Sequence, residues 1–300
     1  MKRTFVGLLL AVYIGGLMQP IKAQTKDNLK GEISLSGAFA LYPMVVKWAE
    51  EFKKIHPNVR IDISGGGAGK GMTDALAKVV DLGMVSRDVH DVEFKKGAVA
   101  FAVVKDAVVP TVNAANPLIR DIKAKGLKRN VALSLWSGKC KTWGNVLGTT
   151  SKVPVHVYTR SDACGAAETW AAWFGKRQED LEGTAVFGDP GVASAVQKDK
   201  VGIGFNNIAY AYDQKTRRTY AGLAIIPLDV NGNGKIDPEE KFYDNSLSLI
   251  KAIVSGKYPS PPARNLFLVS NGVPKKPEVI EFIKYILTEG QKYANATGYI

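Results

Sequence analysis

Cysteine, histidine and long apolar runs are all scarce in this chain of 300 residues. It has 2 cysteines and 3 histidines, and beyond residue 23 no apolar run is long enough to cross a bilayer. Low-complexity tracts and internal repeats are also absent. These absences predict an ordinary globular protein without a membrane span in its main part.

The few histidines limit acid–base chemistry. His56, His90 and His156 are the only possible imidazole bases; His56 precedes a proline at a predicted helix end and His156 lies in a predicted strand, so structural roles are favoured. An enzyme remains the alternative, with Cys164 as a nucleophile whose pKa a helix N-terminus would lower. Lysines and arginines do not cluster with interleaved aromatics, which argues against nucleic-acid binding.

Residues 1–23 have the pattern of a secretory signal peptide. Lys2 and Arg3 precede a short apolar run, and Ala23 suits cleavage before Gln24. An N-terminal anchor is the alternative. No cysteine lies near the cut, so we expect an unlipidated protein in the periplasm.

The net charge and the length of the mature chain indicate its kind of ligand and its number of lobes. Removal of Lys2, Arg3 and Lys22 lowers the formal net charge from +12 to +9. A basic protein favours an anionic ligand, although the charge could serve solubility alone. The remaining chain is longer than a typical single domain, so we expect two lobes.

The two cysteines, Cys140 and Cys164, both lie in the predicted mature chain. In an oxidising compartment a cysteine pair more often forms a disulfide than two free thiols. We therefore predict a tentative Cys140–Cys164 bridge.

Alternating strand and helix patterns predict an α/β fold. A strand at 32–36 leads into an amphipathic helix at 43–55, and a strand at 59–64 leads through a glycine loop into a helix at 72–78. Further strands are predicted at 98–112, 153–159, 201–205 and 266–269, and helices at 166–174, 192–197, 247–254 and 277–298.

Two strand-to-helix turns carry the chemistry, residues 65–71 and 160–166. Helix N-termini present free N–H groups to anions, and glycine lets the backbone approach a ligand. Such loops are often plain connections, but Lys70, Ser86 and Arg87 strengthen the anion interpretation. Neither loop has the spacing of a nucleotide-binding motif.

Several motifs, taken in order, resemble the periplasmic phosphate-binding proteins of ABC transporters. They are residues 36–43, 67–71, 80–87, 160–162, 289–293 and 298–300. The resemblance implies a two-lobed type II periplasmic binding fold with two crossovers, and a monomer that delivers a tetrahedral oxyanion, phosphate first, to a membrane permease. We expect lobe one to span 24–110 with 264–300, and lobe two 111–263.

Carried over by position, the resemblance implies a ligand site that departs from the family. Its residues are Ala40, Leu41, Ala68, Gly69, Lys70, Ser86, Arg87, Arg160, Asp162, Cys164, Gly165 and Ala166. The family has hydroxyls where this chain has Ala40, Ala68, Lys70, Cys164 and Ala166. Either other donors such as Lys70 replace them, or binding is weak, or the ligand is another oxyanion such as sulfate, molybdate or tungstate. We expect Arg87 and Arg160 to contact the anion from opposite lobes, and Asp162 either to orient Arg160 or to accept a ligand proton.

Residues 229–240 match the twelve-residue calcium loop of EF-hands at every ligand position. The predicted ligands are Asp229, Asn231, Asn233, the Lys235 carbonyl, Asp237 and Glu240. Gly234 supplies the sharp turn. A solvated Asn/Gly turn is the alternative; the predicted role for Ca²⁺ is structural.

Overall fold

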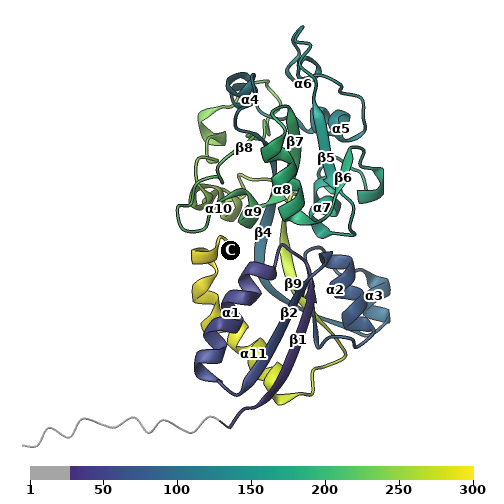
Figure 1. Cartoon of the computed structure of the whole chain (residues 1–300), viewed down its shortest axis with the longest axis vertical. Helices are drawn as coiled ribbons and strands as arrows, with labels where there is room; N and C mark the ends of the chain where they lie inside the picture. Colours follow the sequence, from purple (N-terminus) through teal and green to yellow (C-terminus); the bar gives the residue numbers. More distant parts are fainter. Residues whose placement is uncertain (1–27) are drawn as a thin grey trace, which may run out of the picture.

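The computed structural model describes residues 28–300, so the predicted signal peptide lies outside the described residues. Figure 1 shows two α/β halves, stacked along the long axis and joined through their middle by the strands β4 and β9. Within the described residues, no helix has the length and apolar character needed to cross a membrane.

The lower half of Figure 1 begins with the predicted strand and helix order. Its first elements are β1 (Gly31–Gly37), α1 (Tyr42–Ile55), β2 (Val59–Gly65), α2 (Gly67–Leu76), β3 (Leu82–Val85) and α3 (Asp91–Lys95). Pro43 in the first turn of α1 suits a helix start, and the spacing of Met44, Trp48 and Phe52 buries one face of that helix. Helix α2 starts in the glycine loop itself, earlier than its predicted start at residue 72.

The upper half is built from the middle of the chain. Its elements are α4 (Ile119–Lys125), α5 (Arg129–Trp136), α6 (Trp143–Leu147), β5 (His156–Arg160), α7 (Gly165–Trp173), β6 (Thr184–Val186), α8 (Gly188–Lys198), β7 (Gly202–Asn207), α9 (Ile208–Ala211), β8 (Leu223–Ile225) and α10 (Ser246–Val254). The sequence patterns missed α4, α5, α6, β6 and α9, which are all short.

Two long strands connect the halves. They are β4 (Ala98–Asn113) and β9 (Ala263–Asn271), which pair antiparallel with Asp106 opposite Arg264. The strand order in the sheet is β2-β1-β3-β9-β4-β7-β5-β6, with β8 beside β4. One sheet therefore runs through both halves, and any movement between them has to bend these two strands.

Each half has its own hydrophobic core. The upper core draws on residues from 107 to 263, and the lower core on residues 33–104, Ala209 and residues 266–299. Both predicted lobe boundaries, 110/111 and 263/264, fall within β4 and β9. That the two lobes move relative to each other stays a prediction.

The end of the chain packs on the lower half. Helix α11 (Pro277–Leu287) is shorter than predicted, and two 3₁₀ turns follow it. The Tyr299 hydroxyl donates to the Ala40 carbonyl at 2.7 Å, and Ile300 exchanges backbone hydrogen bonds with Lys105. The first contact holds the loop after β1, and the second joins the end of the chain to β4.

A buried charge pair marks the connecting strands. Asp106 Oδ2 lies 3.6 Å from Arg264 Nη2, and Arg264 also donates to Thr169 Oγ1 and Asn207 Oδ1. Burial raises the pKa of Asp106 to about 7, against the opposing effect of Arg264.

This raised pKa predicts a pH dependence of stability. Because the folded protein holds the Asp106 proton more tightly than the unfolded chain, the free energy of unfolding falls as pH rises toward 7. The difference in unfolding free energy between parent and Asp106→Asn should fall by about 3 kcal/mol from pH 5 to pH 8. Urea unfolding measures it, with Asp121→Asn, an exposed carboxyl on α4, as the control. An unchanged difference would show that Asp106 stays ionised.

Candidate functional site

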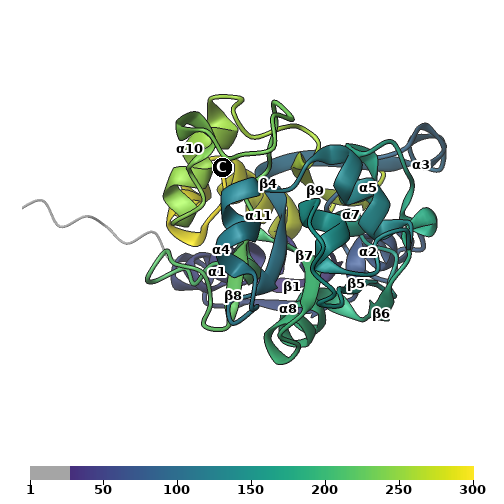
Figure 2. The ribbon, with the colours of Figure 1, turned by 90° about the horizontal axis from the view of Figure 1, so that it is seen from above.

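The two turns that the sequence singled out meet between the halves. Helix α7 lies across the waist from helix α2 in Figure 1, the two overlap in the view from above in Figure 2, and they are in contact. The Gly69 N–H donates to the Ala163 carbonyl at 3.1 Å. A Cβ added at Gly165 would lie 1.9 Å from the carbonyl oxygen of Ser86, so only glycine permits this contact. The two halves are thus in contact along a surface, called the seam below, between residues 67–71 and Ser86 of the lower half and residues 160–166 of the upper half.

Arg160 lies at the end of β5, just before the turn into α7, and its side chain is almost completely buried. Its Nε and Nη2 donate to the two carboxylate oxygens of Asp162, at 2.8 and 2.6 Å. Its Nη1 donates to Asp189 Oδ2 at 2.6 Å. Asp162 therefore orients the guanidinium, one of the two roles that the sequence left open.

Asp189 was missed by the sequence analysis. It lies in the first turn of α8, and its Oδ1 accepts the Asn207 N–H at 3.1 Å. Burial by itself would lower the pKa of Arg160, but Asp189, together with Asp162, keeps it above its ordinary value. Three of the five guanidinium N–H donors are used within the described residues, so two remain for an anion. The Gly188-Asp189-Pro190 turn after a strand was the available signal for Asp189.

The N–H donors of Arg87 bind partners in both halves. Its Nη1 and Nη2 donate to the Glu93 carboxylate at 2.9 and 2.6 Å, and Nη1 also donates to the Asp88 carbonyl. Its Nε lies 3.2 Å from Glu168 Oε2, on α7 of the other half. An anion contact by Arg87, as predicted, therefore has to compete with two carboxylates.

Lys70 pairs with a carboxylate on its own helix, α2. Its Nζ pairs with Asp74 Oδ2, and the Ser36 hydroxyl donates to the same oxygen at 2.7 Å. To replace a missing hydroxyl at the anion site, one of the alternatives left open by the sequence, Lys70 would have to leave Asp74. Asp74 holds the ammonium because residues four apart on a helix are neighbours.

The remaining predicted positions offer few side-chain donors. Ala40, Ala68 and Ala166 are buried, and the backbone N–H of Leu41, another predicted site residue, donates to the Ala38 carbonyl. The first N–H groups of α7, from Gly165 onward, have no acceptor within their own helix. Ser86 is the one predicted site residue with a hydroxyl, and that hydroxyl lies beside Gly165. Any anion here is held by backbone N–H groups, Arg160 and this hydroxyl.

The tentative bridge between the cysteines is not formed. Both are buried free thiols: Cys164 caps α7 by accepting the Ala167 N–H at 3.4 Å, whereas Cys140 lines a separate cavity beside Tyr158 and Glu182. Burial raises the pKa of Cys164 to about 12, although Arg160 opposes it. The thiol is therefore protonated at neutral pH, and the expected lowering of its pKa by the helix dipole is wrong because burial outweighs it.

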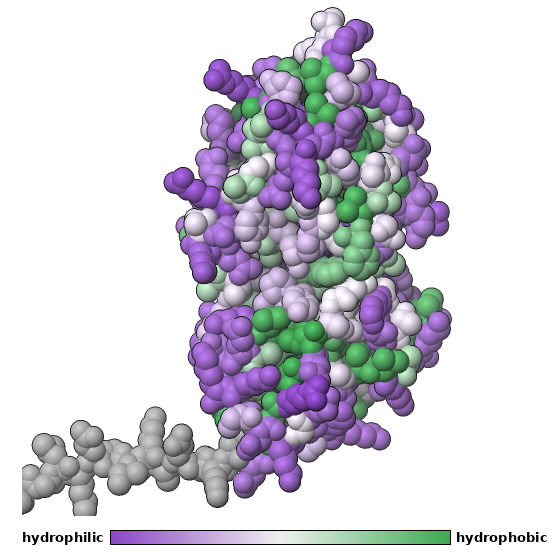
Figure 3. Space-filling view, viewed as in Figure 1, coloured by the Kyte–Doolittle hydropathy of each residue, from purple (hydrophilic) through white to green (hydrophobic). Residues whose placement is uncertain are grey.

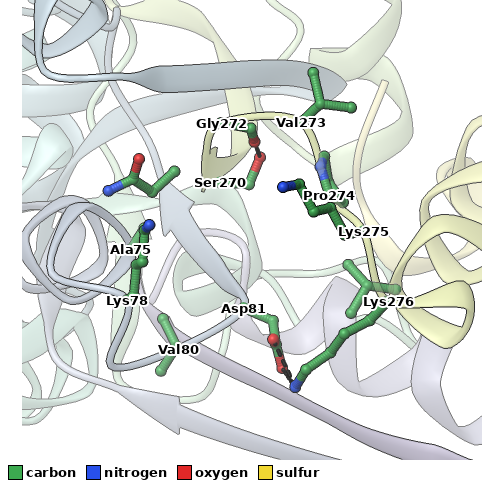
Figure 4. Close-up of a pocket in the computed structure, with 12 residues that line it drawn as sticks. Ala75, Lys78, Val80, Asp81, Ser270, Gly272, Val273, Pro274, Lys275 and Lys276 are labelled. Carbon is green, nitrogen blue, oxygen red and sulfur yellow. Dashed lines mark hydrogen bonds and ion pairs between the residues drawn. The ribbon is translucent and has the colours of Figure 1, made fainter.

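Two cavities flank these elements. One of about 540 Å³ lies beside the connecting strands, with Arg87, Glu168 and Arg264 in its wall. The other, of about 500 Å³, lies between the end of α2 and the loop from β9 to α11 (Figure 4). In it Lys276 pairs with Asp81 at 2.8 Å, and it contains none of the predicted site residues.

The 229–240 loop closes on itself. Glu240 Oε1 accepts the Val230 N–H at 2.8 Å, and Asp229 accepts the N–H groups of Gly232 and Gly234, each at 2.7 Å. Asp229 and Glu240 are buried, although no three His, Cys, Asp or Glu side chains among residues 28–300 gather as a metal cluster. Gly234 has φ +89°, which suits the sharp turn that glycine makes at this position.

Several known proteins are similar to this chain. Phosphate-binding protein PstS of Staphylococcus aureus is 24% identical over 282 residues, covering 91% of this chain and 79% of that protein. PstS of Methanocaldococcus jannaschii is 27% identical, covering 95% of this chain and 86% of that protein.

The solved structures agree in fold. A putative phosphate ABC transporter substrate-binding protein from Clostridium perfringens, solved with bound phosphate, matches with a TM-score of 0.73 at 22% identity, covering 90% of this chain and 99% of that one. An ABC-type phosphate transport receptor from Vibrio cholerae has a TM-score of 0.64 at 19% identity, with 89% and 99% covered. The predicted two-lobed type II binding-protein fold is thereby confirmed. The family model described as the PBP superfamily domain matches residues 22–289, and the chain belongs to that superfamily.

Proposed function

We propose that this protein captures a tetrahedral oxyanion, phosphate first, between its two halves and delivers it to the membrane permease of an ABC transporter. The observation that carries the proposal is the meeting of α2 and α7 beside Arg160, which keeps two free N–H donors in a closed, buried seam. The relatives named as phosphate-binding proteins support phosphate as the ligand.

The proposal is for a binding protein and not for an enzyme. The one candidate nucleophile, Cys164, has its pKa raised to about 12 by burial, which leaves almost no thiolate at neutral pH. The role also requires export, so the proposal includes cleavage after Ala23 and a monomer in the periplasm.

Charge balance bears on which anion is bound. The carboxylates of Asp162 and Asp189 outnumber the Arg160 guanidinium that they hold. A nearby carboxylate favours a protonated oxyanion, which can donate a hydrogen bond, over sulfate, which cannot at neutral pH. Phosphate and arsenate therefore fit the seam better than sulfate.

We also propose that residues 229–240 hold one Ca²⁺. Oxygen donors occupy all six ligand positions of the EF-hand pattern, and the loop ends are already joined by the Val230–Glu240 hydrogen bond. Two of the direct ligands are asparagines, and the ninth position commonly bonds through water, so a compact carboxylate cluster is not needed.

The first test is isothermal calorimetry with phosphate, arsenate, sulfate, molybdate and tungstate. Phosphate should bind, and Arg160→Lys should weaken it by about 2–3 kcal/mol because a single ammonium cannot replace two aligned N–H donors. Arg120→Lys, on the exposed side of α4, is the control and should bind as the parent does. Phosphate binding unaffected by Arg160→Lys would contradict the site, and tighter sulfate binding would contradict the ligand.

The second test concerns closure. Gly165→Ala places a methyl group against the Ser86 carbonyl only when the halves are together, and no left-handed backbone is involved. Phosphate affinity should fall at least about 100-fold, as expected when a well-packed contact is forced apart. The ligand-free melting temperature should stay near that of the parent. Small-angle scattering should show no compaction with phosphate; compaction equal to that of the parent would show that the seam is not the closing surface.

The third test concerns calcium. After chelator treatment, millimolar Ca²⁺ should raise the melting temperature by about 3 °C or more, because it binds the folded loop in preference to the unfolded chain. Glu240→Gln should abolish the rise, since it replaces the bidentate carboxylate. Glu239→Gln, at the exposed neighbouring position, should keep it. A melting temperature indifferent to Ca²⁺ would reduce the segment to an ordinary turn.

A further inference from the structure

Phe39, in the loop between β1 and α1, contacts the other half of the molecule through its ring. The ring centre lies 5.7 Å from that of Phe187, with an angle of 89° between the two rings. The central carbon of the Arg160 guanidinium lies 5.9 Å from the same ring centre. A side chain of the lower half thus lies against the binding arginine of the upper half.

Two glycines leave the space in which the Phe39 ring lies. A Cβ added at Gly65 would lie 2.6 Å from Phe39 Cε1, and one added at Gly188 would lie 3.2 Å from Cε2. The Tyr210 hydroxyl, on α9, donates to the Phe39 carbonyl at 3.1 Å and so fixes the backbone from across the seam. Neither hydrophobic core includes Phe39, so its contacts serve the junction more than the stability of either half.

The pair lies at the rim of the seam. Phe187 is 60% exposed, whereas the Arg160 side chain that Phe39 faces is only 1% exposed. Apolar side chains also gather beside the waist of the molecule on the face seen in Figure 3. The Phe39 ring thus contacts both an exposed aromatic ring and a buried guanidinium.

We propose that Phe39 is a latch residue of the anion site, whose ring covers one face of Arg160 only when the halves are together and so sets how long a bound anion stays. The effect on anion release rests on the proposed function, whereas the effect on closure does not. Edge-to-face aromatic contacts and a cation over a ring are both attractive, and both are lost when the halves separate. Separation is needed for release, so the latch acts on the dissociation rate more than on association.

The experiment compares Phe39→Ala, Phe39→Tyr, Phe187→Ala and the control Phe94→Ala, an exposed aromatic on α3. Stopped-flow release of inorganic phosphate and small-angle scattering of ligand-free protein are the two measurements. Phe39→Ala should release phosphate about tenfold faster, with association changed less than about twofold. Phe39→Tyr should stay near the parent because it keeps the ring, Phe187→Ala should be intermediate, and Phe94→Ala should match the parent.

Gly65→Ala provides a second variant, because its methyl group displaces the ring without removing it, and it should also speed release. Phosphate release at the parent rate from both Phe39→Ala and Gly65→Ala would overturn the latch. If the parent itself bound no phosphate, the proposed function would fail. Scattering of the ligand-free protein would still decide whether Phe39 holds the two halves together. Phe39→Ala more extended than the parent supports the latch, and equal dimensions contradict it.

Discussion

Arg160 is a guanidinium held almost completely out of water, and such a group has to be matched by acceptors where it lies. Asp162, two residues further along the chain, accepts two of its hydrogen bonds, and Asp189, at the start of α8, accepts a third. Together they join the end of β5, the turn before α7 and the first turn of α8. The direction of the free N–H donors, the proposed ligand and the seat of Phe39 all depend on this arrangement.

The two halves contribute unequally to the seam. Arg87 of the lower half has its donors occupied by Glu93 and Glu168, so it links the halves more than it offers a free site. The lower half otherwise presents Ser86, the Phe39 ring, and buried alanines and glycines. With Ser86 as the one hydroxyl among the predicted site residues, affinity has to come from that hydroxyl, backbone N–H groups, the two N–H donors of Arg160 and the exclusion of water by close contact.

The sequence predicted what depends on local pattern. The strand-to-helix order, the two glycine turns and Arg160 with Asp162 follow from spacing along the chain. Pairings between distant residues could not be predicted: Asp189 with Arg160 and Glu168 with Arg87 depend on how the sheet brings strands together. The cysteine bridge failed for the same reason, because residue counts do not place two thiols within bonding distance.

The central claim is that an oxyanion is held beside Arg160, between the starts of α2 and α7. A crystal grown with arsenate tests it most directly, because the anomalous signal of arsenic distinguishes the anion from water. The account predicts one strong peak within hydrogen-bond distance of the Arg160 guanidinium and the first N–H groups of α7. A peak only in the lysine-lined cavity near Lys276, or none anywhere in the seam, would contradict it.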